Sequence, residues 1–189
     1  KIVKDSEGNT LLGTKAVNFV GSTHIWILPL LSGNVIFSSI DGGTSWSKTA
    51  LDFDLSIFMT MKFTDKDKGI IATGPAMATT INGGKTWTKI SGPSQCIETT
   101  CLPKILDLDH VIIQRPLSAA IITIDTGKTW AELPGGDSGI TYTTTTGASK
   151  TSAIADIEWI DANTIWCLLG YSGNIVVRSI DGGKSFTEI

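Results

Sequence analysis

The segment Ser179-Ile-Asp-Gly-Gly-Lys-Ser-Phe186 is one of four copies of a short motif in this chain. The other copies are Ser39-Ile-Asp-Gly-Gly-Thr-Ser-Trp46, Thr80-Ile-Asn-Gly-Gly-Lys-Thr-Trp87 and Thr123-Ile-Asp-Thr-Gly-Lys-Thr-Trp130. Each copy has the order Ser or Thr, Ile, Asp or Asn, any residue, Gly, any residue, Ser or Thr, and an aromatic residue. Four ordered copies of one motif predict a repeat protein.

Each copy has the composition of a tight turn between two β-strands. The Asp or Asn side chain can accept hydrogen bonds from the N–H groups of the turn. A glycine holds the fifth position of every copy, where we expect a positive φ that excludes other residues. We expect the aromatic ring to pack against the base of the hairpin. The residues with these structural roles are Ser39, Asp41, Gly43, Trp46, Thr80, Asn82, Gly84, Trp87, Thr123, Asp125, Gly127, Trp130, Ser179, Asp181, Gly183 and Phe186.

The spacing of the motifs predicts blades of four strands each. Successive Asp or Asn positions lie 41, 43 and 56 residues apart, and the first two intervals suit a four-stranded propeller blade. Blades one and four also match at a constant offset of 140 residues, which aligns Trp26 with Trp166. The third strands are apolar on both faces, as stacked blades require. The pattern therefore indicates an all-β fold.

The motif resembles the Asp-box, or BNR repeat, of sialidase-like, sortilin-like and photosystem-assembly propellers. The resemblance covers nearly the whole chain from about residue 16 onward. It implies a β-propeller of four-stranded antiparallel blades, either a closed four-bladed ring or part of a larger propeller. In that family the box joins the third and fourth strands, on the edge away from the usual active face. The resemblance therefore implies that the boxes are elements of the fold and not catalytic groups.

The domain organisation follows from the motif positions. We expect residues 1–14 to form a lead-in or an extra edge strand, and residues 15–189 to form the propeller. The four blades are expected at about 15–50, 56–91, 101–134 and 153–189. Residues 135–151 are polar and small, so we expect them to form an inserted surface loop. The chain opens with Lys1, so we expect a processed product or a piece of a larger parent chain. An oligomer is a further possibility.

Composition narrows the range of partners. The 189 residues carry a net charge of −3 and are 41% hydrophobic, which is enough for a sizeable core. The lysines are scattered and only two arginines occur, so no nucleic-acid partner is expected. No apolar run reaches membrane-spanning length, so no membrane insertion is expected.

The cysteines and histidines predict no metal site or cofactor. Cys96 and Cys101 flank a short segment and form either a disulfide or two free thiols. Cys167 lies in an apolar run and is expected to be buried. His24 and His110 stand apart from the cysteines, so zinc-ligand spacing is missing.

The resemblance also permits a test of enzymatic function. Sialidases of this kind need three arginines for the substrate carboxylate, because paired guanidinium contacts make lysine a poor substitute. This chain contains only Arg115 and Arg178. The related xyloglucanases use paired carboxylates, and Asp52 and Asp54 are the candidates here. The arginine count argues against a sialidase, and we name no catalytic residue.

We therefore expect a non-catalytic binding or scaffold propeller that is extracellular or lies on a cell surface or virion. A glycan or protein partner is expected on the rim opposite the boxes, because variable loops on a rigid scaffold carry recognition. The candidate ligand-binding residues on that rim are Arg115, Tyr171, Tyr142, Asp52 and Asp54. Two alternatives stay open: a fragment of a larger sialidase-like or other glycan-active hydrolase, and an assembly factor inside a cell or organelle.

Overall fold

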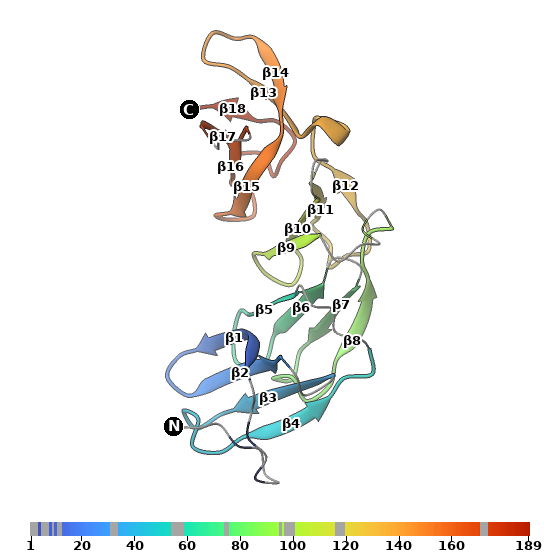
Figure 1. The fold of residues 1–189 in the computed structure, drawn as a ribbon, viewed down its shortest axis with the longest axis vertical. Helices are drawn as coiled ribbons and strands as arrows, with labels where there is room; N and C mark the ends of the chain where they lie inside the picture. Colours follow the sequence, from blue (N-terminus) through green and yellow to red (C-terminus); the bar gives the residue numbers. More distant parts are fainter. Residues whose placement is uncertain are drawn as a thin grey trace.

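The computed structural model describes residues 4, 8, 10, 13–30, 34–53, 59–73, 76–94, 96, 101–115, 120–170 and 174–189. These residues are almost entirely β-structure, as predicted (Figure 1). Three sheets have four strands each, and one sheet has six. Each sheet contains one of the four motifs at the connection between its third and fourth blade strands.

The strands follow the predicted blades closely. Blade 1 is β1 (Thr14–Val20), β2 (His24–Pro29), β3 (Val35–Ser39) and β4 (Ser47–Ala50). Blade 2 is β5 (Met59–Phe63), β6 (Gly69–Thr73), β7 (Ala76–Thr80) and β8 (Thr88–Ser91). Blade 3 is β9 (Leu102–Ile105), β10 (Val111–Gln114), β11 (Ile121–Thr123) and β12 (Ala131–Glu132). Blade 4 is β15 (Ile154–Trp159), β16 (Ile165–Leu169), β17 (Ile175–Ser179) and β18 (Thr187–Glu188). Every pairing within a blade is antiparallel between consecutive strands.

The inserted segment between blades 3 and 4 is not a loop, so that prediction is wrong. It contains a short 3-10 helix, η1 (Gly136–Ser138), and a hairpin of β13 (Ile140–Thr143) and β14 (Ser149–Ser152). β13 pairs in parallel with β18, and this pairing extends the sheet of blade 4 to six strands. Ile140 and Tyr142 are buried on one side of β13, and threonine favours extended structure. These two properties outweigh the polar composition of the segment.

The expected lead-in lies mostly outside the described residues. Within the part that is described, Lys4 and Thr10 form an isolated antiparallel bridge. Thr14 already belongs to β1.

The core lies between the blades. We call the side of a blade that faces the next blade in the chain its forward face, and the other side its backward face. Trp26 and Leu28 on the forward face of blade 1 form one buried cluster with Met61, Phe63 and Ile71 of blade 2. The rings of Trp26 and Phe63 stack with centroids 3.6 Å apart. Similar clusters join blade 2 to blade 3 and blade 3 to blade 4. The apolar third strands of blades 1 to 3 are therefore buried on both sides as predicted, whereas in blade 4 Val176 of β17 is 37% exposed.

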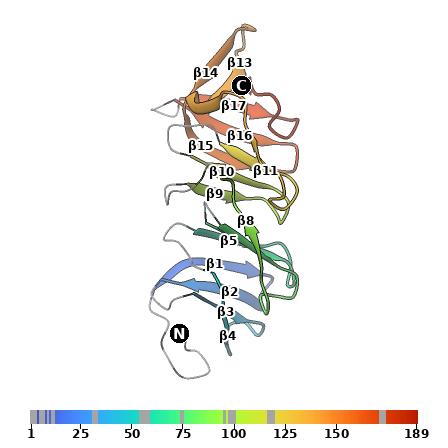
Figure 2. The same ribbon diagram turned by 90° about the vertical axis from the view of Figure 1, so that its right-hand side faces the viewer.

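The blades form an open array. Their first strands contact one another in the order β1, β5, β9 and β15. Blade 1 and blade 4 lie at opposite ends of the molecule in both views (Figures 1 and 2). Of the two arrangements expected, the described residues thus do not form the closed four-bladed ring.

Candidate functional site

The four motifs, which we call boxes, are hairpin turns whose polar side chains hydrogen-bond within the same turn. In the first copy the Ser39 hydroxyl donates to Asp41 Oδ1 at 2.8 Å and accepts the Gly43 N–H at 2.8 Å. The Asp41 carboxylate also accepts the N–H groups of Thr44 and Ser45, at 3.0 and 2.9 Å. The N–H donation from the glycine to the Ser or Thr hydroxyl recurs in the other three copies, at 2.8–3.0 Å. The boxes therefore stabilise the turn.

Hydrogen bonding holds the box carboxylates in their charged form. The hydroxyl and N–H of Thr129 lower the pKa of Asp125 to about 2. Slight burial raises the pKa of Asp181, but hydrogen bonds from Ser185 and Ser179 bring it down to about 2. The pKa of Asp41 is lowered too, first of all by the Ser45 side chain. Among the described residues, no group of three or more His, Cys, Asp or Glu side chains is placed to hold a metal ion.

The fifth-position glycines have the predicted positive φ. The φ angles of Gly43, Gly84, Gly127 and Gly183 are 83°, 87°, 76° and 91°. At Gly183 an added Cβ would lie 2.7 Å from Leu133 Cδ2 of the preceding blade. These glycines are therefore required by backbone conformation, and in some copies also by close packing between blades.

One predicted ligand residue is held in an ion pair on the rim opposite the boxes. Arg115 follows β10, and its Nη2 donates to Glu132 Oε1 on β12 at 2.9 Å. The Arg115 side chain is 13% exposed, while the Glu132 side chain is 45% exposed. Beside them, Gln114 Nε2 donates to the Ala155 carbonyl of blade 4 at 3.4 Å. An approaching partner would therefore meet Glu132 more readily than the guanidinium.

The other predicted ligand residues are not brought together. Asp52 is exposed between the buried Leu51 and Phe53. Tyr142 is 4% exposed and belongs to the apolar cluster between blades 3 and 4, so its expected place on a binding rim is wrong. Asp54 and Tyr171 lie outside the described residues, and so does any pairing of Asp52 with Asp54.

The two arginines occupy different surfaces. Arg178 lies on the forward face of blade 4, with its guanidinium carbon 5.7 Å from the centroid of the Trp166 ring. Arg115 lies on the rim of blade 3. Because neither arginine faces the other, no arginine cluster forms from the residues of this chain.

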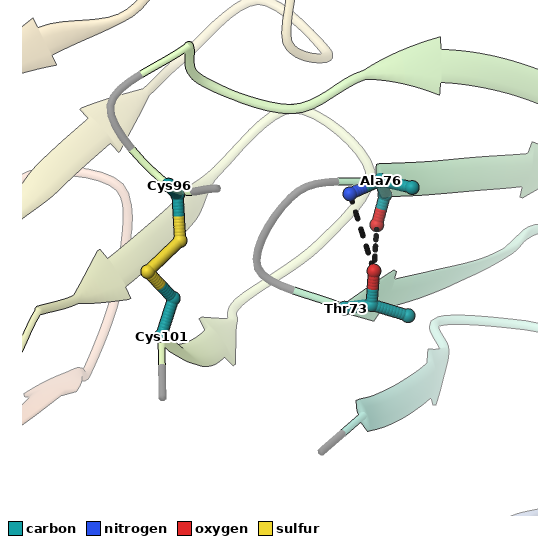
Figure 3. Close-up of a disulfide and its surroundings, with 4 residues drawn as sticks. All are labelled: Thr73, Ala76, Cys96 and Cys101. Atoms are coloured by element: carbon teal, nitrogen blue, oxygen red, sulfur yellow. Dashed lines mark hydrogen bonds between the residues drawn. A yellow bond between two sulfur atoms is a disulfide. The ribbon is translucent and has the colours of Figure 1, made fainter. Parts of the chain in front are cut away.

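A disulfide closes the segment between blades 2 and 3 on the same rim as Arg115. Cys96 and Cys101 are bonded, and both are buried (Figure 3). The figure also shows the nearby turn in which the Thr73 hydroxyl donates to the Ala76 carbonyl at 2.9 Å and accepts the Ala76 N–H at 3.1 Å. The third cysteine, Cys167, is buried as predicted, and burial raises the pKa of its thiol.

Two equivalent clefts between blades were not predicted. The first has a volume of about 370 Å³ and lies between β3 and β4 and the box of blade 2. The second, of about 440 Å³, lies between β11 and β12 and the box of blade 4. The second cleft is lined by Ile122, Ala131 and Leu133. At the equivalent positions the first cleft has the hydroxyl residues Ser38, Ser47 and Thr49. An alignment of the third and fourth strands of each blade would have shown the shared positions, but not that they enclose a cleft.

The box of the following blade contributes a lysine to each cleft. Lys85 lines the cleft between blades 1 and 2, and Lys184 lines the cleft between blades 3 and 4. The clefts share a geometry but differ in polarity, so a common ligand for the two is not indicated.

Comparison with known proteins identifies the fold. No protein-family model and no curated protein sequence matches the chain. Among solved structures, YCF48 bound to a D1 peptide is similar at 17% identity and a TM-score of 0.53, over 100% of this chain and 84% of that one. YCF48 from Cyanidioschyzon merolae is similar at 18% identity and a TM-score of 0.58, over 100% of this chain and 58% of that one. An ancestral GH74 enzyme is similar at 13% identity and a TM-score of 0.55, over 95% of this chain and 24% of that one.

The chain spans 58% and 24% of the last two structures, which is less than two thirds of each. Within the described residues, no helix has the length and apolar character needed to cross a membrane. At these identities the likeness establishes fold alone. The antiparallel four-stranded sheets and the structural relatives together identify the chain as β-propeller blades.

Proposed function

We propose that the chain is a non-catalytic binding propeller of the Asp-box type. Its partner is a protein segment that binds on the rim opposite the boxes, at blades 3 and 4. Support comes from the way charged groups are engaged. Every Asp of a box is bonded within its own turn, and Arg115 is paired with Glu132. These charged groups thus maintain the scaffold, and the departures from the repeat are the candidates for recognition.

The observation that carries this proposal is the inserted β13–β14 hairpin. It is the one β-hairpin in the described residues that lies outside the repeated blade pattern, and it projects from the end of blade 4 (Figure 1). β14 is the edge strand of the six-stranded sheet, and the side chains of Ser149 to Thr151 are exposed. An edge strand presents unpaired backbone groups that an extended peptide can meet by adding a strand. Lys150 at the centre of this edge favours a peptide with an acidic residue opposite it.

The structural relatives support a protein ligand by analogy. One similar structure is YCF48 bound to a D1 peptide, and the same blade architecture there accommodates a protein segment. Glycan binding and a fragment of a larger glycan-active hydrolase remain the alternatives, since GH74 enzymes share the fold. An arginine cluster of the sialidase type would have to come from outside this chain, because its two arginines lie apart.

The location proposed for the protein is extracellular, on a cell surface or on a virion. The Cys96–Cys101 disulfide supports this location, because disulfides persist in oxidising compartments. An assembly factor of an oxidising organelle would have the same requirement, so the disulfide argues mainly against a reducing compartment.

The experiment is a selection followed by a footprint. A displayed peptide library and a glycan array are screened in parallel, and hydrogen exchange is measured with the best ligand of either kind. We expect peptide ligands, protection of residues 140–152, and at least a tenfold loss of affinity in Lys150→Glu. Lys184→Glu on the box rim is the matched control and should bind normally. Glycan ligands alone, or protection confined to the box rim, would refute the proposal.

A further inference from the structure

The forward face of blade 4 is exposed where the same face of blade 1 is buried. Leu168 and Val176 are 36% and 37% exposed, and Trp166 is half-buried. At an offset of 140 residues their counterparts are Leu28, Ile36 and Trp26, which are 0%, 1% and 1% exposed. Blade 2 covers those counterparts. Blade 4 therefore carries the surface of an interblade contact that no blade among the described residues covers.

A polar residue on the first strand of each blade shows the same difference between the covered blades and blade 4. On the first strand of each blade, one forward-facing residue reaches the next blade. The Asn18 side chain accepts the Phe63 N–H at 3.0 Å, and Lys62 Nζ donates to the Ile105 carbonyl at 3.2 Å. Lys104 Nζ pairs with Asp156 at 3.0 Å. The fourth member of the series is Glu158, which accepts a longer contact of 3.5 Å from Lys104 and keeps its side chain 54% exposed.

The backward face of blade 1 is exposed on its first strand, where the same face of blade 2 is buried. Val17 and Phe19 on β1 are 46% and 61% exposed. Their counterparts on β5 are Met61 and Phe63, at 5% and 4% exposed, which pack against blade 1. The outer part of this face is already buried around Phe37 and Trp46. The exposed surface is thus the inner strand, β1. In blade 2 the equivalent strand, β5, carries Phe63, on which Trp26 of blade 1 stacks.

We propose that a second copy of this chain docks the inner strand of its blade 1 onto the forward face of blade 4. Trp166 then stacks on the partner's Phe19, as Trp26 stacks on Phe63 at 3.6 Å. Leu168 packs on the partner's Val17, and Glu158 accepts the N–H of the partner's Phe19. Both halves of the contact are encoded in this one chain, and the contact continues the packing already present between its blades.

The contact is heterologous, because two different surfaces of the same chain meet. Such contacts generate closed rings or open chains of copies, depending on the rotation between successive copies. One copy cannot readily satisfy both of its own ends, since blades 1 and 4 lie at opposite ends of the array (Figure 2). Self-association through this contact is independent of the ligand-binding rim proposed above.

The first test is sedimentation velocity over a concentration series up to the millimolar range. The intact protein should associate. Phe19→Glu and Leu168→Glu each remove one half of the contact, so each variant alone should be monomeric. A mixture of the two variants retains one complete contact and should form a dimer of one copy of each. Ile180→Glu changes an equally apolar residue that is 69% exposed on the box rim and should associate like the unmodified protein.

Three results would overturn the inference: a monomer at every concentration, association that persists in both variants, or a variant mixture that stays monomeric. Phe19 is the most exposed residue of the contact, so Phe19→Glu should retain the circular dichroism spectrum of the folded chain. If Leu168→Glu does not fold, oxidative crosslinking of Phe19→Cys with Trp166→Cys replaces it. Crosslinks between copies support the contact, whereas a crosslink within one copy, or none, refutes it.

Discussion

Replacing Gly183 with alanine should destabilise the chain more than the same change at Gly43. Both glycines hold the fifth position of a box, with φ angles of 91° and 83°. They differ in what an added Cβ would meet. At Gly183 the Cβ would lie 2.7 Å from Leu133 Cδ2 and 3.1 Å from Ile165 Cδ1. At Gly43 the nearest atom is Trp46 Cζ2 at 3.4 Å, an ordinary van der Waals contact.

The magnitude follows from two separate costs. An alanine held at left-handed φ costs about 1–2 kcal/mol, and this cost applies at both positions. Overpacking a closed core adds roughly 1–3 kcal/mol, and only Gly183→Ala has it. Leu133 is 2% exposed within the cluster between blades 3 and 4, so its methyl group has little room to move. The methyl is nevertheless the end of a side chain, which favours the lower half of that range.

The assay is denaturant unfolding of the two variants and of Gly147→Ala. Gly147 has a φ of 84° and nothing within 4 Å of an added Cβ, so it isolates the backbone cost. We expect Gly147→Ala and Gly43→Ala to lose similar free energies of unfolding and Gly183→Ala to lose clearly more. Hydrogen exchange should place the extra loss at blades 3 and 4. Equal losses at Gly43 and Gly183 would refute the close packing, and no loss at any of the three would refute the required left-handed conformation.

Three further predictions concern other parts of the scaffold. Asp181→Asn should make the free energy of unfolding less dependent on pH in the acid range. Folding lowers the pKa of Asp181 from 3.8 to about 2, so its carboxylate contributes stability that is fully present above pH 3.8 and is lost as the pH falls toward about 2. Urea unfolding at several pH values measures this dependence, and an unchanged slope of free energy against pH contradicts the prediction. Replacing Cys96 and Cys101 with alanine should lower the free energy of unfolding by about 2 kcal/mol for a loop this short, and reductant should have no further effect on the double variant. Trp26→Ala should cost about 3–5 kcal/mol, because it removes the stack on Phe63; a loss under 1 kcal/mol in thermal unfolding would show that the stack contributes little.

The sequence was sufficient for features that depend on neighbouring residues. The box turn closes within eight residues, and its geometry needs only Ser39, Asp41 and Gly43 to lie in that order. For this reason the positive φ angles and the hairpin positions could be predicted. The strand bounds followed because each box marks the end of one strand and the start of the next. The third blade, expected at about 101–134, accordingly begins with β9 at Leu102–Ile105.

The features that were missed depend on contacts between distant segments. Ile140 and Tyr142 alternate with threonines, which is a strand pattern, but the glycines and hydroxyl residues around them indicated a loop. The segment forms a strand because it pairs with the edge of β18, where Thr143 lies opposite Thr187. The clefts could not be predicted for the same reason. Each one forms only where the outer strands of one blade meet the box of the next.

The exposure of a forward face is a property of its neighbour and not of the blade itself. Leu28 and Leu168 occupy equivalent positions, yet the first is fully buried and the second is 36% exposed. It follows that the ends of the array can be changed without disturbing the blades, and that self-association and ligand binding can be tested separately. Leu168→Glu should abolish association and leave peptide binding at the β13–β14 hairpin intact, whereas Lys150→Glu should do the reverse. If Leu168→Glu also abolished peptide binding, the binding site would require the contact between copies, and the two surfaces would have to be treated as one.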